Sequence, residues 1–264
     1  MTKALFFDID GTLVSFRTHR IPDSALKAIA AAKERGIRVF IATGRSQAEA
    51  LMKSISQLRE RELIDGYVTM NGAYCFVGDK VIHHNALPAD EARRALEYCA
   101  ETGVACSVVD ERDIFIVQPN DLVRQIFNEY LNVEVLPVIR IDEALRLRNI
   151  YQLSPFVTEE QEDKLRACVP HCEISRWHPA FVDITALGNT KQLGIDLICK
   201  HFDIDVAEAI AFGDGGNDIP MLRHAGIGIA MGNANDTVKA AADYVTTSVD
   251  ENGIAHALQH FGLI

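Results

Sequence analysis

The chain of 264 residues is short of basic side chains: 26 Lys and Arg stand against 37 Asp and Glu, and the formal net charge is −11. A surface that binds nucleic acid or an anionic membrane needs a positive field, so we expect neither class of partner. An anionic ligand would have to be held by a local group of hydrogen-bond donors and a cation, because the field of the whole protein repels it.

Long apolar runs are also missing from the sequence. No stretch approaches the about 20 apolar residues of a membrane span, and the four apolar residues at 4–7 are too few for the core of a secretory signal. We therefore predict a cytoplasmic protein that does not use a membrane. The sequence does not predict an oligomeric state.

The six cysteines do not form the pattern of a disulfide framework. Cys168 and Cys172 are the only close pair, and no second pair or histidine spacing of the metal-binding type accompanies them. Zinc binding at this pair is one interpretation, but we favour two buried or half-buried thiols in a reducing compartment.

What the sequence does contain is the composition of a globular protein, with 48% hydrophobic and 24% charged residues. In its first part, short apolar runs typical of buried strands alternate with helical patterns. The expected strands lie at 5–9, 37–43 and 67–70, the expected helices at 23–35 and 46–61, and a small hairpin at 73–83. This alternation predicts a parallel sheet with right-handed crossovers.

Between about 87 and 184 the strands become less apolar, and the first rhythm then returns from 189. The middle part has expected helices at 89–101, 121–131 and 158–168 and strands at 104–109, 114–118, 149–154 and 181–184. The last part has expected helices at 189–201, 218–225 and 236–242, strands at 209–212 and 228–230, and a final helix that ends near 258. We predict an α/β protein with a doubly wound, Rossmann-like parallel sheet in residues 1–86 and 187–264 and an inserted α/β cap domain in residues 87–186.

The first chemical signal is Asp8-Ile9-Asp10-Gly11-Thr12, at the carboxyl end of the first expected strand. Open α/β sheets bind ligands at that edge, two neighbouring acids favour a cation, and Gly11 allows a sharp turn beside them. Taken alone, these residues are explained equally well by an ordinary acidic turn.

Two further signals are weaker on their own. Ala42-Thr43-Gly44-Arg45 follows a buried strand and offers a hydroxyl, a backbone amide and a helix N-terminus, which together can hold an anion. Lys191 begins a helix, where the helix dipole disfavours a cation. An ordinary loop and a surface lysine remain the simpler interpretations of each.

The fourth signal, Gly213-Asp214-Gly215-Gly216-Asn217-Asp218, follows another expected strand and contains more acids than a flexible turn needs. A nearby set of glycines is similar to a dinucleotide-binding pattern, but its spacing is one residue too long. In addition, no acidic residue lies at the position that would bind the ribose of the dinucleotide. We therefore reject that pattern, which is formed by Gly226, Gly228 and Gly232.

Together the four segments closely resemble the motifs of the haloacid dehalogenase (HAD) superfamily of phosphohydrolases. The long insertion between the second and third motifs, with Met70-Asn71-Gly72-Ala73, is similar to the subclass with an α/β cap that is often called Cof-type. The resemblance covers essentially the whole chain. One departure is Gln192, where family members usually have Gly after the lysine.

The resemblance implies a phosphoric monoester hydrolase in which Asp8 attacks phosphorus and becomes an aspartyl-phosphate. Asp10 would be the general acid and base, for which its pKa must be raised by the neighbouring acids. The phosphoryl oxygens would be bound by donors from the other motifs, namely Lys191, Thr43, the Gly44 amide and Asn217.

The resemblance also implies Mg²⁺ as the cofactor. Asp8, the backbone carbonyl of Asp10, and Asp214 would be its ligands, and Asp218 would orient Lys191 or the waters of the metal. The expected partner is a small phosphorylated metabolite, and a sugar (hexose) phosphate is the family-level expectation. Trp177 and His178 are candidate cap contacts that we do not assign to the site.

Three alternatives remain from the sequence. A phosphomutase or phosphotransferase would use the same four motifs with an alcohol as acceptor. A receiver-type signalling domain also combines Asp, Thr and Lys around magnesium, but it is about half this length and has no Asp-x-Asp pair. A catalytically idle sugar-phosphate sensor is disfavoured, because every expected reactive side chain is present.

Overall fold

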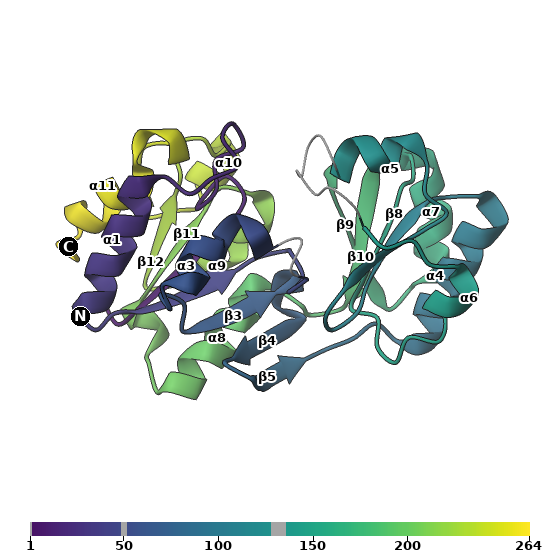
Figure 1. Ribbon diagram of the computed structural model, residues 1–264, viewed down its shortest axis with the longest axis horizontal. Helices are drawn as coiled ribbons and strands as arrows, with labels where there is room; N and C mark the ends of the chain where they lie inside the picture. The colour runs from purple at the N-terminus through teal and green to yellow at the C-terminus, as the bar shows by residue number, and fades with distance from the viewer. Residues whose placement is uncertain (1, 49–51, 128–135) are drawn as a thin grey trace. The chain divides into compact units, whose positions relative to one another are not determined.

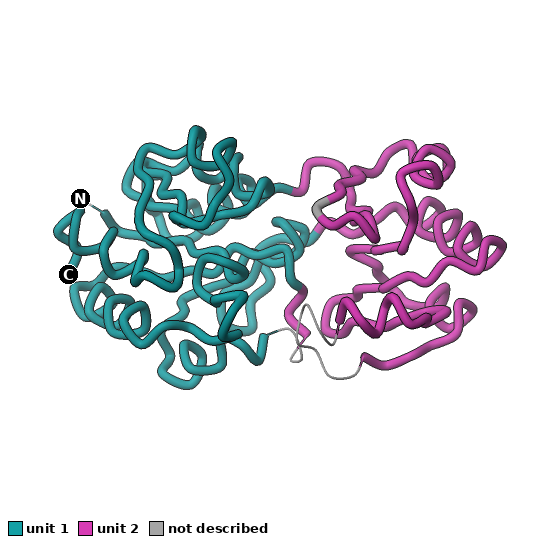
Figure 2. The backbone as a smooth tube through the Cα atoms, turned by 90° about the horizontal axis from the view of Figure 1, so that it is seen from above, with its two compact units in different colours: residues 1–45, 52–84, 190–264 teal, residues 46–51, 85–189 magenta. Residues whose placement is uncertain are grey.

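The computed structural model describes residues 2–48, 52–127 and 136–264, and the chain divides into two compact units (Figure 2). We call residues 1–45, 52–84 and 190–264 the core unit, and residues 46–51 and 85–189 the cap unit. The core unit is therefore assembled from chain segments on both sides of the cap unit.

The core unit is built on a sheet of eight strands in the order β13-β12-β11-β1-β2-β3-β4-β5 (Figure 1). The first six are parallel, while β4 and β5 form an antiparallel hairpin at one edge. The strands are β1 (Ala4–Phe7), β2 (Arg38–Ala42), β3 (Gly66–Thr69), β4 (Tyr74–Val77), β5 (Lys80–His84), β11 (Ala209–Gly213), β12 (Ile227–Ala230) and β13 (Tyr244–Val245).

Helices cover both faces of this sheet because its strands are apolar on both sides. Leu5 and Phe7 of β1 pack in one cluster with α1, α3 and α11, whereas Phe6 packs in another with α8, α9 and α10. The helices are α1 (Asp23–Glu34), α3 (Ser56–Glu60), α8 (Lys191–Phe202), α9 (Ile219–His224), α10 (Asp236–Lys239) and α11 (Gly253–His260). Short 3₁₀ turns lie at Lys53–Ile55, Met70–Gly72, Val206–Glu208, Gly216–Asp218 and Val249–Glu251. The predicted doubly wound parallel sheet is confirmed.

The cap unit has its own sheet of five antiparallel strands in the order β7-β6-β8-β10-β9. Leu96 of α4 and Leu165 of α7 are fully buried in one cluster with Val108 and Ile184 of the sheet, so these two helices cover one of its faces. The elements are α4 (Ala89–Thr102), β6 (Cys106–Val109), β7 (Ile114–Val117), α5 (Asp121–Gln125), α6 (Ile141–Ala144), β8 (Gln152–Pro155), α7 (Glu159–Cys168), β9 (Cys172–His178) and β10 (Phe181–Ala186).

The sequence prediction missed three elements, and each has a physical reason. The edge strand β9 alternates buried Cys172 and Ile174 with exposed Glu173 and Ser175, so its mean hydropathy is low although its period of two is clear. The elements α6 and β13 span four and two residues, which are too few to show a period.

Three predicted helices differ from the structure in extent. The helix predicted at 236–242 is shorter and corresponds to α10, which ends at Lys239. In the stretch predicted as a helix at 46–61, the structure has a 3₁₀ turn followed by the short α3, and residues 49–51 lie outside the described residues. The helix predicted at 121–131 corresponds to α5, and residues 128–131 also lie outside the description.

The cysteines of the described structure are free thiols. Cys172 is buried and donates to Glu91, and burial together with that carboxylate raises the pKa of Cys172 to about 12. Such a thiol stays protonated at neutral pH, so it is a poor zinc ligand. Across the described residues, no helix has both the length and the apolar character needed to cross a bilayer.

Candidate active site

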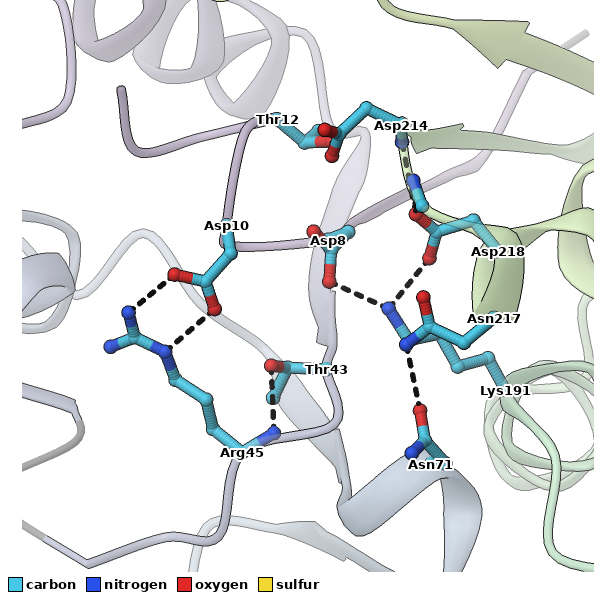
Figure 3. A network of polar contacts seen from close by, with 11 residues as sticks. Asp8, Asp10, Thr12, Thr43, Arg45, Asn71, Lys191, Asp214, Asn217 and Asp218 are labelled. Carbon is cyan, nitrogen blue, oxygen red and sulfur yellow. Dashed lines mark hydrogen bonds and ion pairs between the residues drawn. The ribbon is translucent and has the colours of Figure 1, made fainter. Parts of the chain in front are cut away.

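Three loops of the core unit and the first turn of α8 meet at the carboxyl edge of the parallel strands (Figure 3). Asp8 follows β1, Thr43 follows β2 and Asp214 follows β11, and these three strands are neighbours in the order β11-β1-β2. Parallel strands end at the same edge, so the sheet brings together residues that are more than 200 positions apart in sequence.

Lys191 connects the nucleophile candidate to the loop after β11. Its Nζ donates to Oδ1 of Asp8 and to Oδ1 of Asp218, each at 2.6 Å, and the lysine is only 1% exposed. Burial lowers the pKa of Lys191, but the charges of Asp218 and Asp8 outweigh it, and the pKa is raised overall. The side chain is therefore an ammonium, held in the first turn of α8 against the unfavourable helix dipole.

Asp218 shapes the loop that carries Asp214. Its Oδ2 accepts the backbone N–H groups of Asp214 and Gly215 at 2.9 and 2.8 Å, while its Oδ1 accepts Lys191. A Cβ at Gly213 would lie 2.5 Å from the Asp218 carboxyl carbon, so only glycine fits there. With both oxygens occupied by donors, Asp218 acts as a support for the loop and the lysine.

Asp214 lies directly against the first motif. Oγ1 of Thr12 donates to its Oδ1 at 3.0 Å, and Nδ2 of Asn233 donates to its Oδ2 at 3.1 Å. Gly11 has a φ of +80°, and a Cβ there would lie 2.2 Å from Oδ2 of Asp214. The contact between the two loops therefore requires glycine at position 11.

The three carboxylates of Asp8, Asp214 and Asp218 offer oxygen atoms that all lie within 4.8 Å of one another. Burial raises the pKa of Asp8 well above its usual range, against the effect of Lys191, and the charges of Asp218 and Asp214 add to the rise. Burial and the charge of Asp218 likewise raise the pKa of Asp214 to about 7. Three acids share one ammonium, so the group is short of positive charge and its oxygen donors fit a hard divalent cation.

Asp10 points away from this group. Its two carboxylate oxygens accept Nε and Nη2 of Arg45 at 2.8 and 2.5 Å, a bidentate ion pair that also involves Ser54, whose Oγ accepts Nη1 of Arg45. Sequence reasoning assigned no role to Arg45, although this residue lies in the second motif. The only sequence feature that could have identified Arg45 as a site residue is its position as a polar residue directly after Thr43-Gly44.

The side of the site formed by Thr43 and Gly44 carries two asparagines. Nδ2 of Asn217 donates to Oδ1 of Asn71 at 3.0 Å, and a Cβ at Gly44 would lie 3.3 Å from Nδ2 of Asn71. The sequence singled out the segment of Asn71 but assigned it no function. Both Met70 and Asn71 have positive φ values, 49° and 52°, which hold the amide in this place.

The predicted residues from the four motifs thus lie at one edge of the core unit, with the Asp10 carboxylate turned toward Arg45. Asn233, which the sequence did not identify, joins them from the turn after β12. Of the two cap candidates, the side chain of Trp177 lies outside the described residues, and His178 stacks on Phe181 with ring centroids 5.2 Å apart.

The profile of the haloacid dehalogenase-like hydrolases matches residues 5–258. A solved structure of the HAD subclass IIB sugar phosphatase BT4131 is 54% identical with a TM-score of 0.91, and the match covers 100% of both chains. A second structure, from work on a trigonal-bipyramidal intermediate in a phosphoryl-transfer superfamily, is 54% identical with a TM-score of 0.93 and the same coverage. YkrA of Bacillus subtilis (strain 168), which is named as a phosphatase, is 33% identical over 100% of this chain and 99% of its own length.

The chain therefore belongs to the haloacid dehalogenase-like hydrolase family. The predictions of this superfamily and of an enzyme of the HAD phosphatase type are confirmed.

Proposed function

We propose that this enzyme hydrolyses small phosphate monoesters with Mg²⁺ through an aspartyl-phosphate on Asp8, and that sugar phosphates are its substrate class. The observation that carries the proposal is the surroundings of Asp8. It is a buried carboxylate with one oxygen bound to Lys191, and it lies beside the carboxylate of Asp214 at the ligand-binding edge of the sheet.

The reaction has two displacements at phosphorus. A carboxylate oxygen of Asp8 attacks, a P–O bond to Asp8 forms, and the ester P–O bond breaks as the leaving alkoxide takes a proton from Asp10. Water then attacks the phosphoryl group and gives a proton to Asp10. The P–O bond to Asp8 breaks, and inorganic phosphate leaves.

This role of Asp10 requires a change of partner. Its carboxyl group is bound to Arg45 by two hydrogen bonds, so it has to exchange at least one of them for the leaving-group oxygen. The ester oxygen is an acceptor, so Asp10 can bond to it only after taking up a proton, which solvent can supply because Asp10 is only partly buried.

Lys191, Thr43, the Gly44 amide and Asn217 are the donors for the phosphoryl oxygens. Two carboxylates hold the ammonium group of Lys191 in position. Little reorganisation of this group is therefore needed when charge moves onto the transferring phosphoryl group. Loss of one such donor is expected to lower kcat by about 10²–10³-fold.

Asp8 and Asp214, with the backbone carbonyl of Asp10, are the proposed ligands of Mg²⁺. Asp218 is left as a support, since both of its oxygens already accept hydrogen bonds. The ion, when bound, supplies positive charge that offsets the repulsion between the Asp8 carboxylate and an anionic phosphate ester.

The substrate class rests on the likeness to BT4131, which is described as a sugar phosphatase and shares 54% of its residues with this chain. We assign the choice of leaving group to the cap unit, and a small phosphorylated metabolite is the expected partner. Hydrolysis inside the cytoplasm remains a prediction from the sequence.

A screen of phosphorylated metabolites with Mg²⁺ tests the proposal, with native enzyme and Asp8→Asn assayed side by side for phosphate release. Native enzyme should favour sugar phosphates over nucleotides and amino-acid phosphates, and Asp8→Asn should be inactive. Equal phosphate release by both proteins would show that Asp8 is not the nucleophile.

A further inference from the structure

Asn233 lies in the turn after β12 and makes three hydrogen bonds to three different loops. Its Nδ2 donates to the carbonyl oxygen of Gly11 at 2.9 Å and to Oδ2 of Asp214 at 3.1 Å. Its Oδ1 accepts the backbone N–H of Val249 at 2.9 Å. One side chain thus connects the loops after β1, β11 and β13 at the edge where the candidate metal ligands lie.

The orientation of the amide follows from the partners. Val249 offers an N–H, so the atom that faces it must be the amide oxygen. The amide nitrogen then faces two acceptors, the Gly11 carbonyl and the Asp214 carboxylate. A reversed amide would place donor against donor and oxygen against two oxygens, so only one orientation satisfies all three contacts.

These contacts fix the plane of the Asp214 carboxylate. One of its oxygens accepts Thr12 and the other accepts Asn233, and each keeps a further lone pair. The Gly11 carbonyl that Asn233 also binds lies between Asp10 and Thr12, in the loop that carries Asp8. The amide therefore sets the spacing between the two proposed metal-binding segments.

We propose that Asn233 is a positioning residue for the Mg²⁺ ligand Asp214. This inference rests on the proposed function, since it assumes that Asp214 binds the ion. Outer contacts of this kind change metal affinity by about 10–100-fold, and Asn233 is exposed, so we expect about a tenfold loss of Mg²⁺ affinity without it.

The test compares Asn233→Ala with Asn235→Ala. Asn235 is also an exposed asparagine, two residues further on, but its side chain caps α10 by accepting the N–H of Val238 and makes no contact with the acids. Mg²⁺ binding to each metal-free protein is measured by titration calorimetry, and the melting temperature is measured without metal.

We expect Asn233→Ala to raise the Kd for Mg²⁺ about tenfold, and Asn235→Ala to lower the melting temperature while its Kd stays within about twofold of the native value. A Kd for Asn233→Ala equal to that of native protein, with only a lower melting temperature, would overturn the positioning role. If Asn233→Ala does not fold, Asn233→Ser, which keeps a polar side chain in the turn, is expected to show the same weaker binding, and an unchanged Kd would overturn the inference. Native protein that binds no Mg²⁺ would overturn the proposed function and this inference with it.

Discussion

Asp8 of the core unit and Glu91 of the cap unit are both buried carboxylates, at 6% and 2% exposure. Glu91 accepts the backbone N–H and ring Nδ1 of His171 and the thiol of Cys172. Burial alone would raise the pKa of Glu91, but these donors outweigh it and the pKa is lowered. For Asp8 the balance is reversed, because burial and neighbouring acids outweigh Lys191.

The difference separates a structural acid from a reactive one. Glu91 anchors the start of β9 to the first turn of α4 with its donors in place, so its charge stabilises the fold. The acids of the core unit share too few positive charges, and their charge destabilises the fold until a ligand supplies more. Buried carboxylates with raised pKa values of this kind are typical of active sites.

Among the substitutions that test this difference, Lys191→Met should have the largest effect on stability and on kcat. Removal of the ammonium leaves Asp8 and Asp218 buried without their cation, and loss of one partner of a buried ion pair costs about 3–5 kcal/mol. Denaturant unfolding should show that loss, and kcat should fall about 10²–10³-fold. Native stability in this variant would mean that the acids are neutral in the folded protein.

Glu91→Gln is the matched change in the cap unit. It keeps the shape but replaces an acceptor of three donors with an amide, which should lower the free energy of unfolding by about 1–3 kcal/mol. The kcat of the folded enzyme should stay unchanged. A lower kcat at temperatures where the variant is fully folded would contradict the structural role of this acid.

The two acids should also respond to pH with opposite sign. Asp214 has a folded pKa of about 7 against an ordinary value of 3.8, so it contributes stability when protonated and loses it as pH rises between those values. Glu91 has a folded pKa below its ordinary 4.5, so its contribution is present above that value and is lost as pH falls through the folded pKa. Melting temperatures of metal-free native protein, Asp214→Asn and Glu91→Gln, measured from about pH 2 to pH 8, separate the two.

In that series Asp214→Asn should show a smaller decline toward pH 7 than native protein, because Asp8 also has a raised pKa and keeps its own contribution. Glu91→Gln should show a smaller decline at acid pH than native protein. Parallel curves for all three proteins would show that neither carboxylate changes its pKa on folding.

The smallest expected effect is the change in melting temperature that Asp214→Asn causes in the metal-free protein. Because the amide carries no charge, its melting temperature near pH 8 should equal or exceed that of native protein by a few degrees. Mg²⁺ should raise the melting temperature of native protein but not of this variant. If the metal-free variant is less stable than metal-free native protein, Asp214 is a structural acid of the same kind as Glu91.

The sequence identified the acids and the lysine of this site because each follows a buried strand or begins a helix. Parallel strands end at one edge, so their positions follow from the topology alone, as for Asp8, Thr43 and Asp214. The pairing of Asp10 with Arg45 depends on side-chain rotamers that topology does not determine. Asn233 was missed because a single asparagine after Gly232 is typical of an ordinary turn.

The prediction of the fold from the sequence has the same limit, because features set by long-range packing are not visible in a local pattern. Strands such as β1 and β11 are buried on both faces and stand out as continuous apolar runs, whereas β9 is half polar and lies at an edge. Its pairing with β10 is a long-range property that depends on the rest of the sheet. Elements of two to four residues, such as β13, are determined by their neighbours.

The stereochemical course at phosphorus tests the central claim most directly. A thiophosphate ester made chiral with oxygen isotopes is hydrolysed by native enzyme in isotope-labelled water, and the configuration of the released thiophosphate is determined. Two displacements through Asp8 predict net retention of configuration. Net inversion would mean that water attacks the ester in one step, and it would contradict a phosphoryl group carried on Asp8.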